Sequence, residues 1–272
     1  MRILVAGAGG MLGQDVMRLA GPDAVGLTHA ELDITDAAAT DAAVERARPA
    51  AVINCAAYTD VDSAESAQEL ALAVNGEGAG NLAAAAAKAG APVLYVSSDY
   101  VFDGTKREPY VESDETGPVS SYGRSKLAGE EATAAANPRH FIVRSSWLFG
   151  VGGRNFVETM LTVDRDELKV VDDQIGCPTF TGHLAEGLLR LVSRDDHGVH
   201  HVAGGGSCSW FELAREIFAR SDVDKRVEPC TTDEFPRPAR RPAWSVLGTE
   251  RADPVRLPSW QDGLDAYLGA RA

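Results

Sequence analysis

Short apolar runs alternate with alanine-rich stretches along the first half of the chain. Each apolar run is long enough for one strand, and the runs occupy residues 2–7, 23–28, 49–57, 91–100 and 139–150. The stretches between them predict helices that begin near Met11, run from Asp36 to Ala47, cover residues 80–90 and include Lys126. Strands that alternate with helices indicate βαβ units and a parallel sheet. Strands that are apolar throughout are typical of a sheet covered by helices on both faces.

The pattern changes after about Gly150. Further helices are expected at Asn155–Val163, His183–Val192, Trp210–Arg220 and Trp260–Leu268, and loops rich in Gly, Pro and Arg separate them. Long loops that follow a regular sheet usually carry binding function. We therefore expect a sheet domain over residues 1–150 and a smaller substrate-binding lobe over residues 151–272, interleaved with the end of the sheet.

The composition narrows the range of partners. The 272 residues include 26 Lys and Arg against 40 Asp and Glu, a net charge of −14. A chain this acidic repels nucleic acid and anionic membranes. No apolar run approaches the roughly 18 residues of a membrane span, and the stretch after Met1 is too short and too glycine-rich for a secretory core. We expect a cytoplasmic protein that binds a small molecule, and neither nucleic acid nor a membrane.

The cysteines and histidines do not form a metal-binding pattern. The four cysteines are widely spaced, without a C-x-x-C pair, so we expect reduced thiols. The run "HGVHH" at residues 197–201 enters an apolar stretch, and no carboxylate–histidine set surrounds it. The sequence therefore predicts no metal ligands.

A glycine-rich loop follows the first apolar run. "VAGAGGMLG" places Gly7, Gly9, Gly10 and Gly13 directly after a strand and at the start of a helix. Glycine allows the tight turn, and the missing side chains let the backbone approach a pyrophosphate. The helix N-terminus then presents free N–H groups and a partial positive charge. A plain strand-to-helix turn is the alternative, but this context favours dinucleotide binding.

Tyr122 and Lys126 stand four residues apart in "SSYGRSKLAGEE". One interpretation is a solvated helix face, with the ring lying over the lysine stem. The other is a proton-donating phenol, because a ketone that accepts hydride needs a group that stabilises the oxygen and supplies a proton. A neighbouring ammonium would lower the pKa of the phenol from its ordinary value near 10. Four residues apart on a helix, both side chains point to one side.

Several motifs together resemble the extended short-chain dehydrogenase/reductase superfamily. They are the Gly7-x-x-Gly10-x-x-Gly13 spacing, the turn "NCAAYTD", the spacing of Asn75, Gly78 and Asn81, and "YVSSDYVFDG". The resemblance implies a Rossmann-type, doubly wound parallel sheet with an NAD(P)-binding domain at residues 1–150. It implies that Ser98 hydrogen-bonds the substrate oxygen, that Tyr122 donates the proton and that Lys126 also holds the nicotinamide ribose. The expected cofactor contacts are Gly7, Gly10, Met11, Leu12, Gly13, Asp33, Ile34, Ala56, Ala57, Tyr58, Tyr122 and Lys126.

Within that superfamily the chain resembles the dTDP-4-dehydrorhamnose reductase family from Met1 to about Leu268. The motifs, in family order, include "SSDYVFDG", "RSSWLFG", "DDQIGCPT" and "RRPAWSVL". Ser98 stands where the family often has Thr, and either hydroxyl can donate the bond. Nucleotide-sugar dehydratases carry Thr-Asp-Glu at residues 98–100, so Tyr100 argues against elimination. The resemblance implies reduction of the C4 ketone of dTDP-6-deoxy-L-lyxo-4-hexulose to dTDP-L-rhamnose.

The resemblance also implies a set of substrate contacts. For Arg241 the residues agree, because Arg237, Arg240 and Arg241 form a basic cluster in an acidic chain, and guanidinium matches diphosphate geometry. A solvated loop is the alternative for this cluster, and core packing is the alternative for Trp147. The expected contacts are Asp99, Tyr100, Val101, Trp147, Asn155, Phe156, Gln174, Pro178, Thr179 and Arg241.

The cofactor prediction depends on the end of the second strand. That strand ends "GLTH" without the acid that usually bonds the ribose 2′-hydroxyl of NAD, and Asp33–Ile34 suits a place beside the adenine. We expect NADPH, with NADH accepted. A ketoreductase for another TDP-deoxysugar and a non-catalytic NADP-binding regulatory subunit stay open as alternatives. A homodimer also stays open, as does a magnesium requirement, which some family members have.

Overall fold

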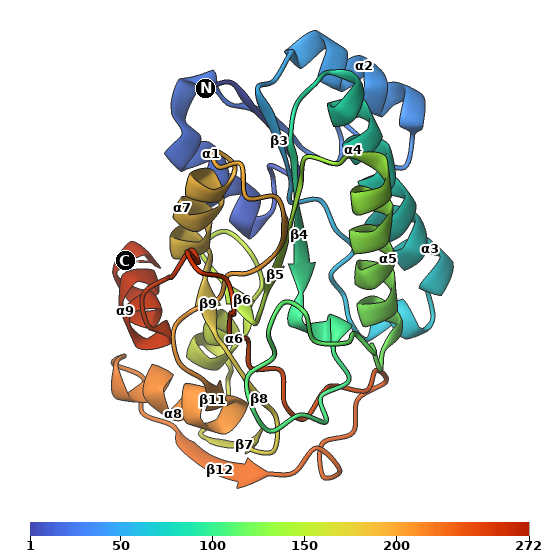
Figure 1. The fold of residues 1–272 in the computed structure, drawn as a ribbon. Coiled ribbons are helices and arrows are strands. Elements are labelled where there is room, and N and C mark those ends of the chain that lie inside the picture. The colour runs from blue at the N-terminus through green and yellow to red at the C-terminus, as the bar shows by residue number, and fades with distance from the viewer. Residues whose placement is uncertain (272) are drawn as a thin grey trace.

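The computed structural model describes residues 1–271, and a six-stranded parallel sheet lies at its centre (Figure 1). The strand order is β10-β5-β4-β3-β1-β2. The predicted α/β fold with a doubly wound parallel sheet is confirmed. The strands are β1 (Ile3–Ala6), β2 (Val25–Leu27), β3 (Ala51–Asn54), β4 (Val93–Ser98), β5 (His140–Ser145) and β10 (Gly198–His201).

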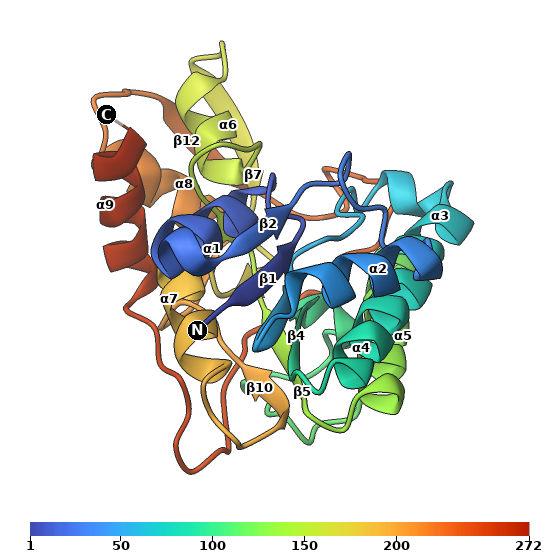
Figure 2. The same ribbon diagram turned by 90° about the horizontal axis from the view of Figure 1, so that it is seen from above.

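Helices cover both faces of this sheet (Figure 2). One face packs against α1 (Met11–Ala20) and α7 (Thr181–Leu191), and the other against α2 (Ala37–Ala47), α4 (Ala79–Lys88) and α5 (Ser121–Ala136). Successive strand residues point to opposite faces. Val5 therefore lies in the core beneath α1 and α7, whereas Leu4 lies in the core beneath α2 and α4. This double burial explains why the strands are apolar throughout.

The helix before the fourth strand is longer and less regular than expected. It begins with α3 (Gln68–Leu72), continues through a π-helical segment at Ala73–Gly78 and leads into α4. Asn75 lies in the π-helical segment. Its side chain accepts the Tyr58 N–H at 2.8 Å and donates to the Tyr58 carbonyl at 3.0 Å and to Ser125 Oγ at 2.9 Å. Asn75 thus ties the turn after β3 to helix α5.

A second core forms in the later part of the chain. It gathers side chains from α6 (Phe156–Thr162), α8 (Trp210–Ala219) and α9 (Trp260–Arg271), and the four helices expected after residue 150 are all present. α7 and β10 pack with the main sheet instead, and the division of the chain at residue 150 stays a prediction. The short strands here are β6 (Leu148–Phe149), β7 (Glu167–Val171), β8 (Ile175–Gly176), β9 (Thr179–Phe180), β11 (Cys208–Ser209) and β12 (Arg226–Cys230).

A buried ion pair fastens α5 to the sheet. Arg144 on β5 donates from Nη2 to Glu130 Oε2 at 2.7 Å and from Nε to Glu130 Oε1 at 3.0 Å. Ser97 on β4 donates to the same carboxylate at 2.5 Å. Both charged side chains are 5% exposed, so each charge depends on the other for neutralisation. Glu130 is one helical turn beyond Lys126, and the pair therefore fixes the helix that carries the expected catalytic residues.

Removing one member of this pair should destabilise the protein more than removing both. Glu130→Met alone leaves the Arg144 charge buried without its partner, and such losses cost about 3–5 kcal/mol of unfolding free energy. Glu130→Met combined with Arg144→Met removes both charges and should recover most of that loss. Chemical denaturation of the two single variants and the double variant measures this. A double variant that is less stable than either single one would contradict the assignment.

Candidate active site

A cleft at the carboxyl ends of β1, β2 and β3 contains the glycine loop. It has a volume of about 420 Å³, and Gly7, Gly9 and Gly10 line it. Gly7 has a φ of 75°, and a Cβ atom there would lie 2.5 Å from the Ala56 nitrogen. Only glycine fits at this position, because the loop passes so close to the turn that follows β3. Ala56, Ala57 and Tyr58 form the adjoining wall.

The N-terminus of α1 opens onto this cleft. Gly10 is the N-cap residue, and within residues 1–271 no side chain caps this end of the helix, so its N–H groups remain for a phosphate. Gly13 and the side chain of Leu12 are buried against the core. Met11 Sδ lies 3.7 Å from Asn155 Nδ2. The Leu12 side chain therefore faces the core, and only the backbone of Leu12 and Gly13 could contact a ligand.

The far wall of the cleft includes Asp33 and Ile34. The Asp33 carboxylate accepts the N–H and the hydroxyl of Thr35 at 3.0 Å and 2.8 Å. Glu31 lies just outside the residues that line the cleft and was not expected from the sequence; its carboxylate accepts the Thr28 N–H at 2.9 Å and the Thr28 hydroxyl at 2.8 Å. The end of β2 therefore does carry an acid nearby, four residues after Leu27. In the sequence this acid is the Glu of the "THAEL" segment at residues 28–32.

Ser98, Tyr122 and Lys126 meet at the carboxyl end of β4. Ser98 Oγ donates to Asp99 Oδ1 at 3.0 Å and accepts the Tyr100 N–H at 3.1 Å. Tyr122 lies in the first turn of α5, within hydrogen-bonding reach of Ser98. Lys126 Nζ donates to the Val96 carbonyl at 2.7 Å. Ser98 on β4 and the Tyr122–Lys126 pair on α5 thus share one site.

The pKa values differ from the expected tuning. The pKa of Tyr122 is raised to about 12, mainly by burial; the Ser98 hydrogen bond opposes the shift and the charge of Asp99 adds to it. Burial also lowers the pKa of Lys126 to about 7, although the nearby Glu130 carboxylate works the other way. The expected lowering of the Tyr122 pKa by Lys126 is therefore wrong for this structure. Burial of both groups, which the spacing of the two residues does not reveal, outweighs the effect of the ammonium charge.

Asp99 is a buried carboxyl next to this group. Besides Ser98, its side chain accepts a hydrogen bond from Ser146 Oγ at 2.9 Å. Burial raises the pKa of Asp99 to about 6, although the hydrogen bonds from Ser245, Ser146 and Ser98 oppose the shift. Tyr100 lies edge-on to Tyr122, with ring centroids 5.9 Å apart. Two of the expected substrate residues therefore contact the catalytic candidates directly.

An aromatic stack stands among the other expected substrate residues. Trp147 adopts a left-handed backbone conformation with a φ of 47°, which is strained for a bulky side chain. Its ring stacks on the Trp210 ring, with centroids 3.5 Å apart. The Phe156 ring also packs against Trp210, with centroids 4.7 Å apart. Asn155 caps α6 through the Glu158 N–H at 2.9 Å. Trp210 was not singled out in the sequence, where it resembles an ordinary core aromatic.

The other residues expected to contact the substrate are mostly buried and interact with neighbouring protein groups. Val101 is fully buried in a small core with Phe102 and Tyr110. Thr179 is fully buried and donates to the Cys177 carbonyl at 3.1 Å. Gln174 donates to Thr232 Oγ1 at 2.9 Å. Pro178 presents its carbonyl to Gly204, where a Cβ atom would not fit.

Arg241 lies beside Tyr100 and pairs with Asp62, a residue of the loop that follows the cofactor turn. Burial lowers the pKa of Arg241, but the hydrogen bond and charge of Asp62 outweigh it and raise the pKa above its ordinary value. Arg237 also pairs with Asp62, at 2.6 Å, and its side chain is 51% exposed. The basic loop is therefore held in place rather than freely solvated.

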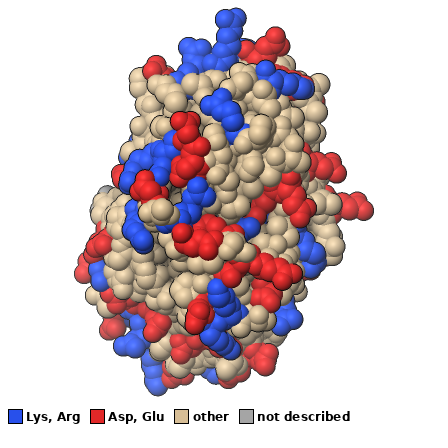
Figure 3. Space-filling model, viewed as in Figure 1, with Lys and Arg blue, Asp and Glu red and all other residues tan. Residues whose placement is uncertain are grey.

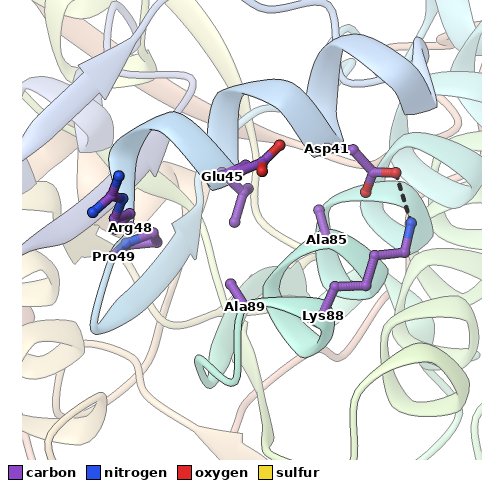
Figure 4. A pocket seen from close by; sticks show the side chains of 8 residues that line it. Asp41, Glu45, Arg48, Pro49, Ala85, Lys88 and Ala89 are labelled. Carbon is purple, nitrogen blue, oxygen red and sulfur yellow. Dashed lines mark hydrogen bonds and ion pairs between the residues drawn. The ribbon is translucent and has the colours of Figure 1, made fainter.

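Two surface features lie outside this site. A groove between α2 and α4 has a volume of about 610 Å³, and Lys88 bridges it to Asp41 at 2.6 Å (Figure 4). On the face seen in Figure 3, acidic and basic side chains are interspersed. Among residues 1–271, no group of three or more His, Cys, Asp or Glu side chains is arranged to hold a metal. Over the same residues, no helix is long and apolar enough to cross a membrane.

The sheet, the glycine cleft and the Ser98–Tyr122–Lys126 group define an extended short-chain dehydrogenase/reductase. Comparison with known proteins narrows this class. The family model described as RmlD substrate binding domain matches residues 1–271. The chain belongs to the dTDP-4-dehydrorhamnose reductase family.

Three relatives illustrate the match. The chain is 44% identical to a dTDP-4-dehydrorhamnose reductase of Mycolicibacterium smegmatis, over 100% of this chain and 85% of that protein. It is 42% identical to a dTDP-4-keto-6-deoxy-D-glucose reductase of Streptomyces niveus, over 91% of this chain and 88% of that protein. A dTDP-4-dehydrorhamnose reductase structure from Bacillus anthracis, in complex with NADP, superposes with a TM-score of 0.95 at 38% identity over 99% of both chains.

Asp99 should make the folded protein less stable as the pH rises. Its pKa is about 6 when folded and near 3.8 when exposed, so the folded state holds the proton more tightly. Its stabilising contribution is complete below about pH 4 and is lost as the pH rises through about 6. Relative to Asp99→Asn, the wild-type free energy of unfolding should fall by about 3 kcal/mol between these limits. Denaturation across this pH range measures it, and parallel profiles would contradict the assignment.

Proposed function

We propose that this protein reduces the C4 ketone of dTDP-4-dehydrorhamnose to dTDP-L-rhamnose, with NADPH as the reductant. The observation that carries the proposal is the convergence of Ser98, Tyr122 and Lys126 beside a glycine-lined cleft. Family membership over the whole described chain supports the substrate class, and the relative in complex with NADP supports the cofactor.

The residues of the cleft fit a dinucleotide. Gly7 has no room for a Cβ atom, Gly9 and Gly10 leave their backbone open to the cleft, and the end of α1 lacks a side-chain cap within residues 1–271. The pyrophosphate would bind at this helix end, where N–H groups and the helix dipole favour an anion. When bound, the reduced nicotinamide would supply the hydride that converts the ketone into an alkoxide.

Tyr122 would supply the proton to the substrate oxygen. The phenol is protonated at neutral pH and so carries the proton to be donated, although burial, by raising its pKa, makes it a weaker acid. Ser98 would exchange its hydrogen bond to Asp99 for one to the same oxygen, which places two donors on the developing charge. Lys126 would bind the nicotinamide ribose, and its Nζ is already held by the Val96 carbonyl at 2.7 Å.

The remaining expected residues would surround the nucleotide sugar. Trp147, backed by Trp210, offers a rigid apolar wall for the sugar. Arg241 offers a guanidinium for the diphosphate. Asp99, Tyr100 and Asn155 would complete the sugar site, while Val101, Gln174, Pro178 and Thr179 would act through backbone atoms or as supports. The residues 151–272 would thus contribute most of the substrate lobe.

A second ketoreductase substrate has a specific observation in its favour. A relative at 42% identity is named for dTDP-4-keto-6-deoxy-D-glucose, so the family includes more than one 4-ketosugar. Turnover of a small panel of TDP-4-ketosugars, with the stereochemistry of each product, separates these substrates. A non-catalytic regulatory subunit would turn over none of them despite binding NADPH, and this result would overturn the proposal.

Tyr122→Phe should abolish most activity and leave the fold intact. The variant removes the proton donor, and general acids of this kind contribute on the order of 10² or more to kcat. NADPH binding, followed by the fluorescence of the bound cofactor, should persist within a few fold. Loss of NADPH absorbance on addition of the ketosugar nucleotide gives kcat. A variant that keeps more than about half of the wild-type kcat would show that Tyr122 is not the acid.

Both NADPH and NADH should support turnover, with kcat/KM values within about 100-fold of each other. The Glu31 carboxylate beside Thr28 lies at the end of β2, where the ribose 2′ position is read in this fold. Glu31→Gln should therefore shift the ratio of dissociation constants towards NADPH by roughly three- to tenfold, the size expected for one screened charge. Glu45→Gln, in the groove between α2 and α4, is the matched control. Equal shifts in both variants would rule out a local role for Glu31.

A further inference from the structure

We propose that Asp62 is a positioning residue for the substrate diphosphate, because it fixes Arg241 in the place where a phosphate would be read. The inference rests on the proposed function and assigns a role to an acidic residue at a site built to hold an anion. An acid in such a place is unexpected, since its own charge repels phosphate. Its contacts show why it nevertheless belongs there.

The Asp62 carboxylate collects donors from three residues of one loop. Arg241 pairs with it through Nη1, Arg237 donates from Nε at 2.9 Å and the Ala239 N–H donates at 3.1 Å. The Asp62 and Arg241 side chains are 17% and 15% exposed. Asp62 therefore organises residues 237–241 through both side-chain and backbone donors.

The contacts with Asp62 and Ala239 engage only one nitrogen of the Arg241 guanidinium. A guanidinium has five N–H donors, two of them on Nη1. Asp62 and the Ala239 carbonyl, which lies 2.7 Å away, both engage Nη1. The other three donors remain for Tyr100, which also bonds Arg241, and for an incoming diphosphate. Asp62 thus orients the guanidinium and does not consume its phosphate-binding edge.

The charges also favour positioning over competition. Burial alone would raise the pKa of Asp62, but the bonds from Arg241, Ala239 and Arg237 outweigh it and lower the pKa to about 2, so Asp62 is ionised at neutral pH. One carboxylate against two guanidinium groups leaves the loop positively charged. Without Asp62, Arg237 and Arg241 would repel each other, and the flexible Arg241 side chain would lose its fixed direction.

The same turn also holds the catalytic helix. Asp62 begins a 3₁₀ turn at Ser63–Glu65, and Glu65 accepts the Ser121 N–H at 2.8 Å and the Ser121 hydroxyl at 2.9 Å. Ser121 is the first residue of α5, directly before Tyr122. One short segment therefore sets the position of Arg241 relative to the proton donor. This arrangement would align the sugar with Tyr122 when the diphosphate is bound.

The experiment measures dTDP binding to the NADPH-loaded protein by calorimetry, together with KM and kcat for the ketosugar nucleotide. Asp62→Asn should weaken dTDP binding and raise KM by roughly five- to twentyfold and leave kcat within about twofold, because the diphosphate contact is equal in ground and transition states. In an Arg241→Ala background the same change should have less than a twofold effect. Asp41→Asn is the control and should leave dTDP binding unchanged, since Asp41 pairs with Lys88 in the groove between α2 and α4, outside this loop.

Each alternative outcome overturns a defined claim. Tighter dTDP binding by Asp62→Asn would show that Asp62 competes with the phosphate. An equal loss with and without Arg241 would show that Asp62 does not act through that residue. If Asp62→Asn fails to fold, Asp62→Glu keeps the charge and should bind dTDP better than Arg241→Ala; binding no better than Arg241→Ala would overturn the inference. Wild-type protein that does not bind dTDP would overturn the proposed function and this inference together, whereas wild-type binding that Asp62→Asn leaves unchanged overturns the inference alone.

Discussion

The close seating of α5 on its neighbours is the constraint on which the site depends. A Cβ atom at Gly129 would collide with the Asn75 carbonyl and the Tyr95 ring, and one at Gly123 would collide with the Tyr100 carbonyl. The two glycines let the helix approach β4 and the turn after it until Tyr122 reaches Ser98. The Glu130–Arg144 pair then holds the helix at that distance from the sheet. A wider spacing would leave the same three residues present and unable to share a substrate atom.

Lys126 and Arg241 each have a protein partner that fixes the side chain. Lys126 bonds a strand carbonyl, and Arg241 bonds Asp62. An acidic protein can hold anionic ligands only through such local groups, since its long-range field repels them. Fixed cations lose little conformational entropy on binding, which favours affinity. Trp147 is also held in a fixed position, by its strained backbone and by the stacked Trp210 ring.

Much of this arrangement could be predicted from local pattern. The strands, the main helices and the glycine loop follow from periodicity and turn chemistry, because these depend on neighbours in sequence. The contact between Asp62 and Arg241 could not be predicted, since 179 residues separate them. The pKa of Tyr122 was also mispredicted, because burial depends on the packed structure and outweighs the nearby ammonium. The β7–β12 ladder was missed because its strands are short and largely exposed.

The main sheet is completed by elements from the later part of the chain, and this order affects how the protein folds during its synthesis. α7 covers one face of the sheet beside α1, and β10 completes the edge next to β5, yet both follow the residues that build α6. While a ribosome has released only the first 150 residues, Val5, Ile53 and Leu94 lack the cover that Leu184 and Leu188 later provide. The nascent sheet therefore exposes an apolar face until about residue 201 has emerged. The second core stays open for longer, because α8 and α9 follow residue 201.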